Sequence, residues 1–148
     1  RRTSGSSRCS GLSSSMRTRP VSGSTAILSW LPPIAWAGVL FALSAGSGPA
    51  FTPPIPHLDK LEHAAAYGLL GFLVARAVAR TLLVEAFGAV LCGGLAAGLY
   101  GASDELHQSF VPGRRVEVAD AVADTFGGFA GAAFFATVVR TRSRATRG

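Results

Sequence analysis

Charged residues are scarce in this sequence, and lysine is nearly absent. Of the 148 residues, 49% are hydrophobic and only 15% are charged, whereas soluble domains average about 25% charged residues. The basic residues are arginines apart from a single lysine, Lys60. A chain of this length forms one domain, and its few charges do not suffice to cover a water-soluble core. The composition therefore predicts a membrane protein.

Several chemical signatures are also missing. The two cysteines, Cys9 and Cys92, form no metal-binding CxxC spacing. The sequence has no HExxH zinc motif, P-loop, dinucleotide fingerprint or nucleophile elbow. We therefore predict neither a metal nor a cofactor. The arginines lie mainly at the chain ends and helix junctions rather than along one interleaved face, which favours a membrane surface over nucleic acid as the partner.

Long apolar runs are what the sequence has in abundance. Residues 26–45 form an uncharged run of about 30 Å as a helix, enough to cross the hydrocarbon core of a bilayer. Three more runs are predicted as membrane helices, at residues 59–80, 82–107 and 118–139. Glycines in GxxxG spacing in the last two runs are typical of closely packed membrane helices. The predicted fold is all-α, a membrane bundle of four transmembrane helices, whose oligomeric state stays open.

The flanking segments have a different composition. Residues 1–25 are rich in Ser, Arg and Gly and are predicted to be a disordered basic tail. Residues 140–148 form a second basic tail. The true start, Arg1 or Met16, is left open, as is cleavage of the first apolar run as a signal peptide, although that run is long for one.

The distribution of basic residues predicts the orientation in the membrane. Four spans place both termini on one side, together with 11 arginines, while the other side has three basic residues, Lys60, Arg114 and Arg115. The side richer in basic residues is normally cytoplasmic. We therefore expect a multi-pass protein of the plasma membrane with both termini in the cytoplasm.

Acidic residues and histidines gather at the opposite, outer end of the predicted helices. All three histidines and seven of the eight acidic residues lie there; Glu85 is the exception. Asp59, His63 and Tyr67 are spaced i, i+4, i+8 and share one helix face. Charged groups buried in a membrane are costly, so such clusters are typically paired or functional.

Two further segments bring polar side chains to the same end. Asp104, His107 and Gln108 share a face of the third predicted helix, and Asp120 and Asp124 share a face of the fourth. Between these helices, Val-Pro-Gly-Arg at residues 111–114 suits a type II turn that directs Arg114 back toward the helix ends. We expect His63, Asp104, His107, Arg114 and Asp120 to converge, with Arg114 pairing with Asp104 or Asp120.

A simpler interpretation applies to other charged residues at this end. Lys60, Glu62, Glu105, Arg115 and Glu117 are expected to be solvated at the membrane interface rather than to belong to a site. A metal site formed by His63, His107 and nearby carboxylates is chemically possible, but no ligand motif supports it.

Three motifs resemble the VanZ-like family of small membrane proteins: DKLEHAAAY, SDELHQSFVPGR and DAVADTFGG. The resemblance extends over residues 26–139, and its most specific block is SDELHQ with PGR. Asp124 departs from the family pattern, which usually has Asn there. Combining the motifs with the spacing, the candidate polar site comprises Asp59, His63, Tyr67, Ser103, Asp104, Glu105, His107, Gln108, Arg114, Asp120 and Asp124.

The resemblance implies a cell-envelope role, and the family is named for a protein linked to resistance to the glycopeptide antibiotic teicoplanin. Three functions stay open. The first is a non-enzymatic membrane protein that binds a lipid-linked or lipidated envelope ligand and contributes to glycopeptide tolerance. The second is a membrane enzyme acting on a lipid-linked substrate, with His63 or His107 as general base or nucleophile and Arg114 holding a phosphate. The third is a structural bundle that assembles with a partner.

Overall fold

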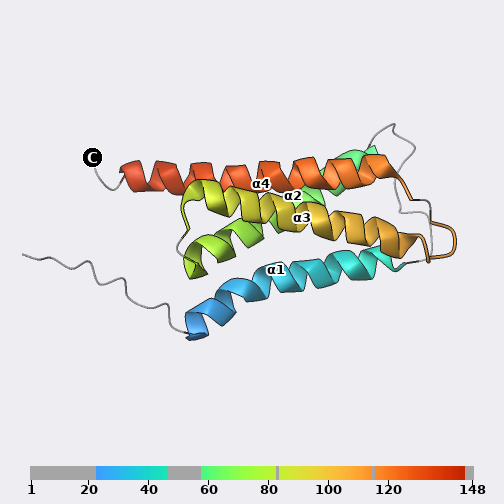
Figure 1. The fold of residues 1–148 in the computed structure, drawn as a ribbon, viewed down its shortest axis with the longest axis horizontal. Coiled ribbons are helices and arrows are strands. Elements are labelled where there is room, and N and C mark those ends of the chain that lie inside the picture. The colour runs from blue at the N-terminus through green and yellow to red at the C-terminus, as the bar shows by residue number, and fades with distance from the viewer. Residues whose placement is uncertain (1–22, 47–57, 83, 115, 146–148) are drawn as a thin grey trace, which may run out of the picture.

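The protein is an antiparallel bundle of membrane-spanning helices. The computed structural model describes residues 23–46, 58–82, 84–114 and 116–145, and every regular element within them is an α-helix. Helices α1 (Gly23–Ser44), α2 (Leu58–Thr81), α3 (Ala86–Gln108) and α4 (Val118–Ala145) alternate in direction (Figure 1). All four are long and apolar enough to cross a membrane. This confirms the predicted fold, and the protein is a multi-pass membrane protein.

The helix bounds differ from the predicted ones by more than one residue at three places. Helix α1 begins at Gly23 rather than at residue 26, and residues 1–22 of the predicted basic tail lie outside the described residues. Helix α3 begins at Ala86 instead of residue 82, because Glu85 has an extended backbone. Helix α4 continues to Ala145, beyond the predicted end at residue 139, and arginine, frequent in this stretch, is a good helix former.

Small residues allow helices α2, α3 and α4 to pack with their backbones close together. A Cβ added to Gly131 would collide with the carbonyl oxygen of Gly68, and one on Gly71 with that of Gly128. On the α3 side, a Cβ on Gly98 would lie 2.9 Å from the Thr125 hydroxyl. Lipid gives helices no hydrophobic reason to associate, so such close van der Waals packing is what holds them.

Helix α1 lies at the side of this three-helix core. It contacts α2 and, less extensively, α3, and no contact between the described residues of α1 and α4 is found. Two polar bonds tie it down: the Trp36 indole donates to the Ala66 carbonyl over 2.9 Å, and the Tyr100 hydroxyl donates to the Ala37 carbonyl over 2.7 Å. Much of its remaining surface is apolar and exposed, as expected for a helix bordered by lipid.

One end of the bundle contains almost all of its buried polar groups. The last turn of α1, the first turns of α2 and α4, the last turns of α3 and the α3–α4 connection meet there. We call this the polar end. Helix α1 begins and helix α4 ends at the opposite end (Figure 1), so both termini of the bundle lie on one side, as four spans require.

Candidate functional site

Lys60 is the centre of an ion cluster at the polar end. Its ammonium nitrogen lies 2.8 Å from Asp59, 2.6 Å from Glu117 and 2.6 Å from Asp120. The Lys60 side chain is only 24% exposed. The expectation that Lys60 is simply solvated is therefore wrong: this cation joins the first turn of α2 to the first turn of α4 and the residue before it.

The same three acids have the arrangement of a cation site. One oxygen from each of Asp59, Glu117 and Asp120 lies within 4.8 Å of the others, and carboxylates are hard oxygen ligands for divalent cations. In this structure the Lys60 ammonium lies among them. The protein thus supplies the cation from its own chain, and the group is explained as an ion-pair cluster.

His63 and Asp124 form a second polar contact between α2 and α4. The His63 Nδ1 atom lies 2.9 Å from Asp124 Oδ1, and Asp124 is completely buried. The ring of His63 stacks on that of Tyr67, one turn further along α2. When Nδ1 donates to the Asp124 carboxylate, the Nε2 atom of His63 is the ring nitrogen left to accept a proton.

Backbone packing explains why these two side chains meet. A Cβ on Gly127 would collide with the backbone of Ala64, the residue after His63. A Cβ on Gly101 of α3 would lie 2.6 Å from the carboxylate of Asp124. Gly127 therefore lets α4 approach α2 beside His63, and Gly101 leaves space on α3 for the Asp124 side chain.

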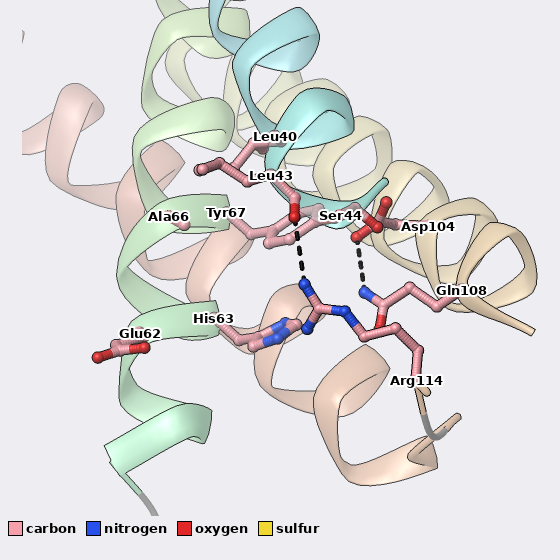
Figure 2. Close-up of a pocket in the computed structure, with 10 residues that line it drawn as sticks. All are labelled: Leu40, Leu43, Ser44, Glu62, His63, Ala66, Tyr67, Asp104, Gln108 and Arg114. Carbon is pink, nitrogen blue, oxygen red and sulfur yellow. Dashed lines mark hydrogen bonds between the residues drawn. The ribbon is translucent and has the colours of Figure 1, made fainter. Parts of the chain in front are cut away.

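A pocket of about 360 Å³ opens between α1, α2, α3 and the α3–α4 connection. Figure 2 shows polar side chains from α2, α3 and the connection facing the last turns of α1. The polar part of the lining comprises Ser44, Glu62, His63, Tyr67, Asp104, Gln108 and Arg114. The apolar part comprises Leu40, Leu43 and Ala66. This volume lies within the range of small-molecule sites, about 300–1,000 Å³.

Arg114 reaches the pocket through the predicted turn. Gly113 has a φ of +84°, and the Arg114 amide donates to the Val111 carbonyl over 3.2 Å, as in a type II turn. The expected pairing of Arg114 with Asp104 or Asp120 is wrong. Its guanidinium instead donates to the Leu43 and Gly46 carbonyls, at 3.2 and 3.3 Å. These carbonyls lack helical partners because α1 ends there, so Arg114 ties the connection to α1 (Figure 2).

Three buried polar groups remain at the inner wall of the pocket. Asp104 is 7% exposed, and one of its oxygens accepts a hydrogen bond of 3.2 Å from Gln108. Tyr67 and Ser44 are 2% and 5% exposed. The Tyr67 hydroxyl lies near Asp104, yet neither it nor the Ser44 hydroxyl has a partner at hydrogen-bond geometry among the described residues.

The other candidate residues do not line this pocket. His107 packs against Phe41, with ring centres 4.7 Å apart. Glu105 is buried and accepts a hydrogen bond from the Glu117 amide over 2.9 Å, so it is not solvated as expected. Ser103 is exposed and donates to the Tyr100 carbonyl. The residues expected to form one site therefore lie in two groups. His63, Asp104 and Arg114 line the pocket, whereas Asp59 and Asp120 surround Lys60.

Sequence reasoning missed two features of the site. The contribution of α1, through Leu40, Leu43 and Ser44, was not expected because this helix has no charge. A signal was available in Trp36, since an indole N–H inside an apolar helix needs an acceptor, and that acceptor is on α2. The role of Lys60 had a signal too: it is the only lysine and stands in the first turn of a membrane helix.

Comparison with known families identifies the class of protein. Residues 11–140, most of the chain, match the VanZ/LLP1 family. The chain belongs to the VanZ/LLP1 family. The match confirms the resemblance drawn from the motifs that contribute His63, Asp104 and Arg114 to the pocket. Searches of curated proteins and of solved structures found no match to this VanZ/LLP1 protein.

Proposed function

We propose that this VanZ/LLP1 protein binds an amphiphilic component of the cell envelope in the pocket at its polar end, with that end facing out of the plasma membrane. The observation that supports this most is the composition of the pocket. His63, Asp104 and Arg114 provide polar contacts, and Leu40 and Leu43 of α1 provide an apolar wall. A lipid-linked or lipidated envelope molecule has the same two parts, a polar head group and a hydrocarbon chain.

The surroundings of α1 support entry from the bilayer. Leu43 lines the pocket and is 65% exposed, and Val39, one turn earlier on the same face of α1, is 44% exposed. Apolar surface therefore continues from the pocket wall to the face of α1 that borders lipid. A hydrocarbon chain following this surface keeps its apolar contacts while the head group enters the pocket.

A protein of this kind contributes to tolerance of teicoplanin-type glycopeptides by binding or shielding an envelope component outside the membrane. The test compares a glycopeptide-sensitive bacterial host that carries the wild type, Arg114→Ala or Arg115→Ala. Both variants remove one arginine from the same connection, but Arg114 lines the pocket and holds the end of α1. The side chain of Arg115 lies outside the described residues.

We expect wild type and Arg115→Ala to raise the inhibitory concentration of teicoplanin and Arg114→Ala to do so less, at equal amounts of protein in the membrane. The stability of each purified variant is measured in parallel. Because Arg114→Ala removes two hydrogen bonds of a charged group, we expect it to lower the free energy of unfolding by about 1–2 kcal/mol. An ordinary surface substitution changes this free energy by under about 0.5 kcal/mol. Equal tolerance from both variants, or none from the wild type, contradicts the proposal.

The His63–Asp124 pair favours a second candidate, an enzyme that acts on a lipid-linked substrate. A buried carboxylate on Nδ1 fixes the ring and its tautomer, as general-base histidines require. His63 also lines the pocket where a substrate head group would lie. Purified protein incubated with labelled polyprenyl phosphates distinguishes the two candidates: turnover that His63→Ala abolishes supports the enzyme, whereas binding without turnover supports the first proposal.

A further inference from the structure

Asp104 is a buried acid for which the described residues provide no cation. It is 7% exposed and lines the pocket; among the described residues it accepts a hydrogen bond from the neutral Gln108 amide, and the neutral Tyr67 hydroxyl lies near it. A carboxylate in such a low-dielectric position is strongly unfavourable unless a cation or several donors compensate it. The question is which group supplies that compensation.

The cations nearby are already committed elsewhere. Lys60 binds three other carboxylates, and His63 binds Asp124. Arg114, which lines the same pocket, donates to main-chain carbonyls of Leu43 and Gly46. Within the part of the chain that the structure describes, no salt bridge reaches Asp104. His107, three residues along α3, packs against Phe41, and its buried Nε2 atom has no hydrogen-bond partner among the described residues. A cation paired with Asp104 would therefore have to come from a bound molecule.

The pocket wall beside Asp104 also contains two hydroxyl groups without hydrogen-bond partners among the described residues. Tyr67 and Ser44 line the pocket, and their hydroxyl oxygens are buried and lack hydrogen-bond partners among the described residues. Together with the second Asp104 oxygen they offer three acceptors, which is the number of N–H donors on a primary ammonium group. Hydroxyls alone would also suit a phosphate, but the Asp104 charge opposes an anion.

We propose that Asp104, Tyr67 and Ser44 form a subsite for the primary ammonium group of an amphiphile. This rests on the proposed function and names the chemistry of its ligand. The apolar wall of Leu40 and Leu43 contacts the hydrocarbon part. The Arg114 guanidinium uses two of its nitrogen atoms for the Leu43 and Gly46 carbonyls, and its remaining N–H groups are available to an anionic group of the same molecule, such as the phosphate of an aminophospholipid. The chain uses the same chemistry internally, since carboxylates surround the Lys60 ammonium.

The test measures lipid binding to the purified protein by the rise in its thermal unfolding temperature in detergent. The probes are phosphatidylethanolamine, phosphatidylcholine and phosphatidylglycerol with identical acyl chains. The first has a primary ammonium, the second a quaternary ammonium without N–H donors, and the third no cation. We expect phosphatidylethanolamine to stabilise most. Two further probes separate the two parts of the ligand. Dodecylamine has a hydrocarbon chain and an amine but no phosphate, and we expect it to compete with phosphatidylethanolamine. Ethanolamine has an amine but no hydrocarbon chain, and we expect it not to compete.

Asp104→Asn keeps the shape of the side chain and an oxygen for the Gln108 hydrogen bond but removes the charge. We expect it to weaken phosphatidylethanolamine binding on the order of tenfold or more, the loss typical of a hydrogen bond to a charged group. Glu85→Gln, the same chemical change at the opposite end of the bundle, is the control and should bind like the wild type. Circular dichroism and gel filtration verify that both variants fold, and Asp104→Glu should restore part of the affinity.

The outcomes separate this inference from the proposed function. Stronger stabilisation by phosphatidylglycerol that depends on Arg114 contradicts the ammonium subsite but supports a pocket for an amphiphile. Unchanged phosphatidylethanolamine binding by Asp104→Asn contradicts the subsite as well, and identifies Asp104 as a structural group. Absence of stabilisation by every one of the amphiphiles contradicts both proposals.

Discussion

Single polar side chains connect the helices at the polar end. Lys60 joins α2 to the start of α4, and His63 joins α2 to the second turn of α4 through Asp124. Arg114 joins the α3–α4 connection to α1. Each interaction satisfies a group that would otherwise be unpaired near the membrane. Removing one partner of such a pair leaves the other buried and uncompensated, which costs more than the pair itself contributes.

Asp124 provides the sharpest residue-scale prediction, because it is completely buried beside His63. Asp124→Ala removes the acceptor of His63 and should lower the free energy of unfolding by about 3 kcal/mol, at the low end for a buried pair, since the His63 side chain remains 25% exposed. Asp124→Asn, which keeps an oxygen acceptor, should lower the free energy of unfolding by only about 1 kcal/mol.

Denaturation in a series of SDS–detergent mixtures, followed by circular dichroism, measures both variants. Glu85→Ala serves as control because Glu85 is exposed at the opposite end of the bundle and its side chain forms no capping hydrogen bond to α3. A loss for Asp124→Ala no greater than that for Glu85→Ala would show that the His63–Asp124 contact does not stabilise the fold.

Among whole helices, the contact of α2 with α4 depends on residues without side chains. Glycines line this contact. An added Cβ would collide with the opposite helix at Gly71, Gly127 and Gly131, and with Ala97 of α3 at Gly128. At Gly68 it would lie 3.2 Å from the Gly127 carbonyl oxygen, a tight contact. Membrane helices without large interlocking side chains associate in this way. The same approach sets the positions of His63 and Asp124, so packing and site geometry are linked.

Gly131→Leu and Gly98→Leu should therefore disrupt the bundle. Overfilling a packed interface costs about 1–3 kcal/mol or more, and Gly131, which faces a backbone carbonyl, should be the more sensitive of the two. Gly38→Leu on α1 is the matched control, because a Cβ there meets nothing within 4 Å. Thermal unfolding in detergent is the measurement; similar midpoints for all three variants would place the glycine faces toward lipid.

The whole molecule is asymmetric across the membrane. In the four-span topology predicted from the sequence, seven of its eight acidic residues are assigned to the polar end and 11 of its 14 basic residues to the side of the termini. Positively charged segments are retained in the cytoplasm during membrane insertion. This distribution is the basis for placing the pocket outside the cell.

Topology reporters test that orientation. A reporter that is active only outside the cytoplasm should be silent when fused after Arg147 and active when inserted after Gly113, in the connection at the polar end. Matching reporters that are active only in the cytoplasm should give the reverse pattern. Activity of the first reporter after Arg147 contradicts the orientation, and would favour removal of the first span as a signal peptide.

The fold followed from the sequence because its determinants are local. A run of apolar residues has to form a helix in lipid to satisfy its own backbone hydrogen bonds, so hydropathy alone predicted four helices in nearly their observed positions. The turn before Arg114 was equally predictable, since Pro112 and Gly113 fix the backbone without help from distant residues. The gathering of acidic residues and histidines at one end of the bundle followed from the positions of the apolar runs.

The pairing of side chains was decided only by the tertiary structure. Sequence spacing places Asp104, Asp120 and Arg114 at the same end of the bundle, but it does not give the direction of each side chain around its helix axis. The expected ion pair of Arg114 with one of these acids was therefore wrong. The close approach of α4 to α2 at Gly127, and the space that Gly101 leaves on α3, bring Asp124 rather than Asp120 to His63. Asp120 pairs with Lys60. Helix ends are fixed by local composition, whereas partners across helices depend on rotations and separations that all four helices set together.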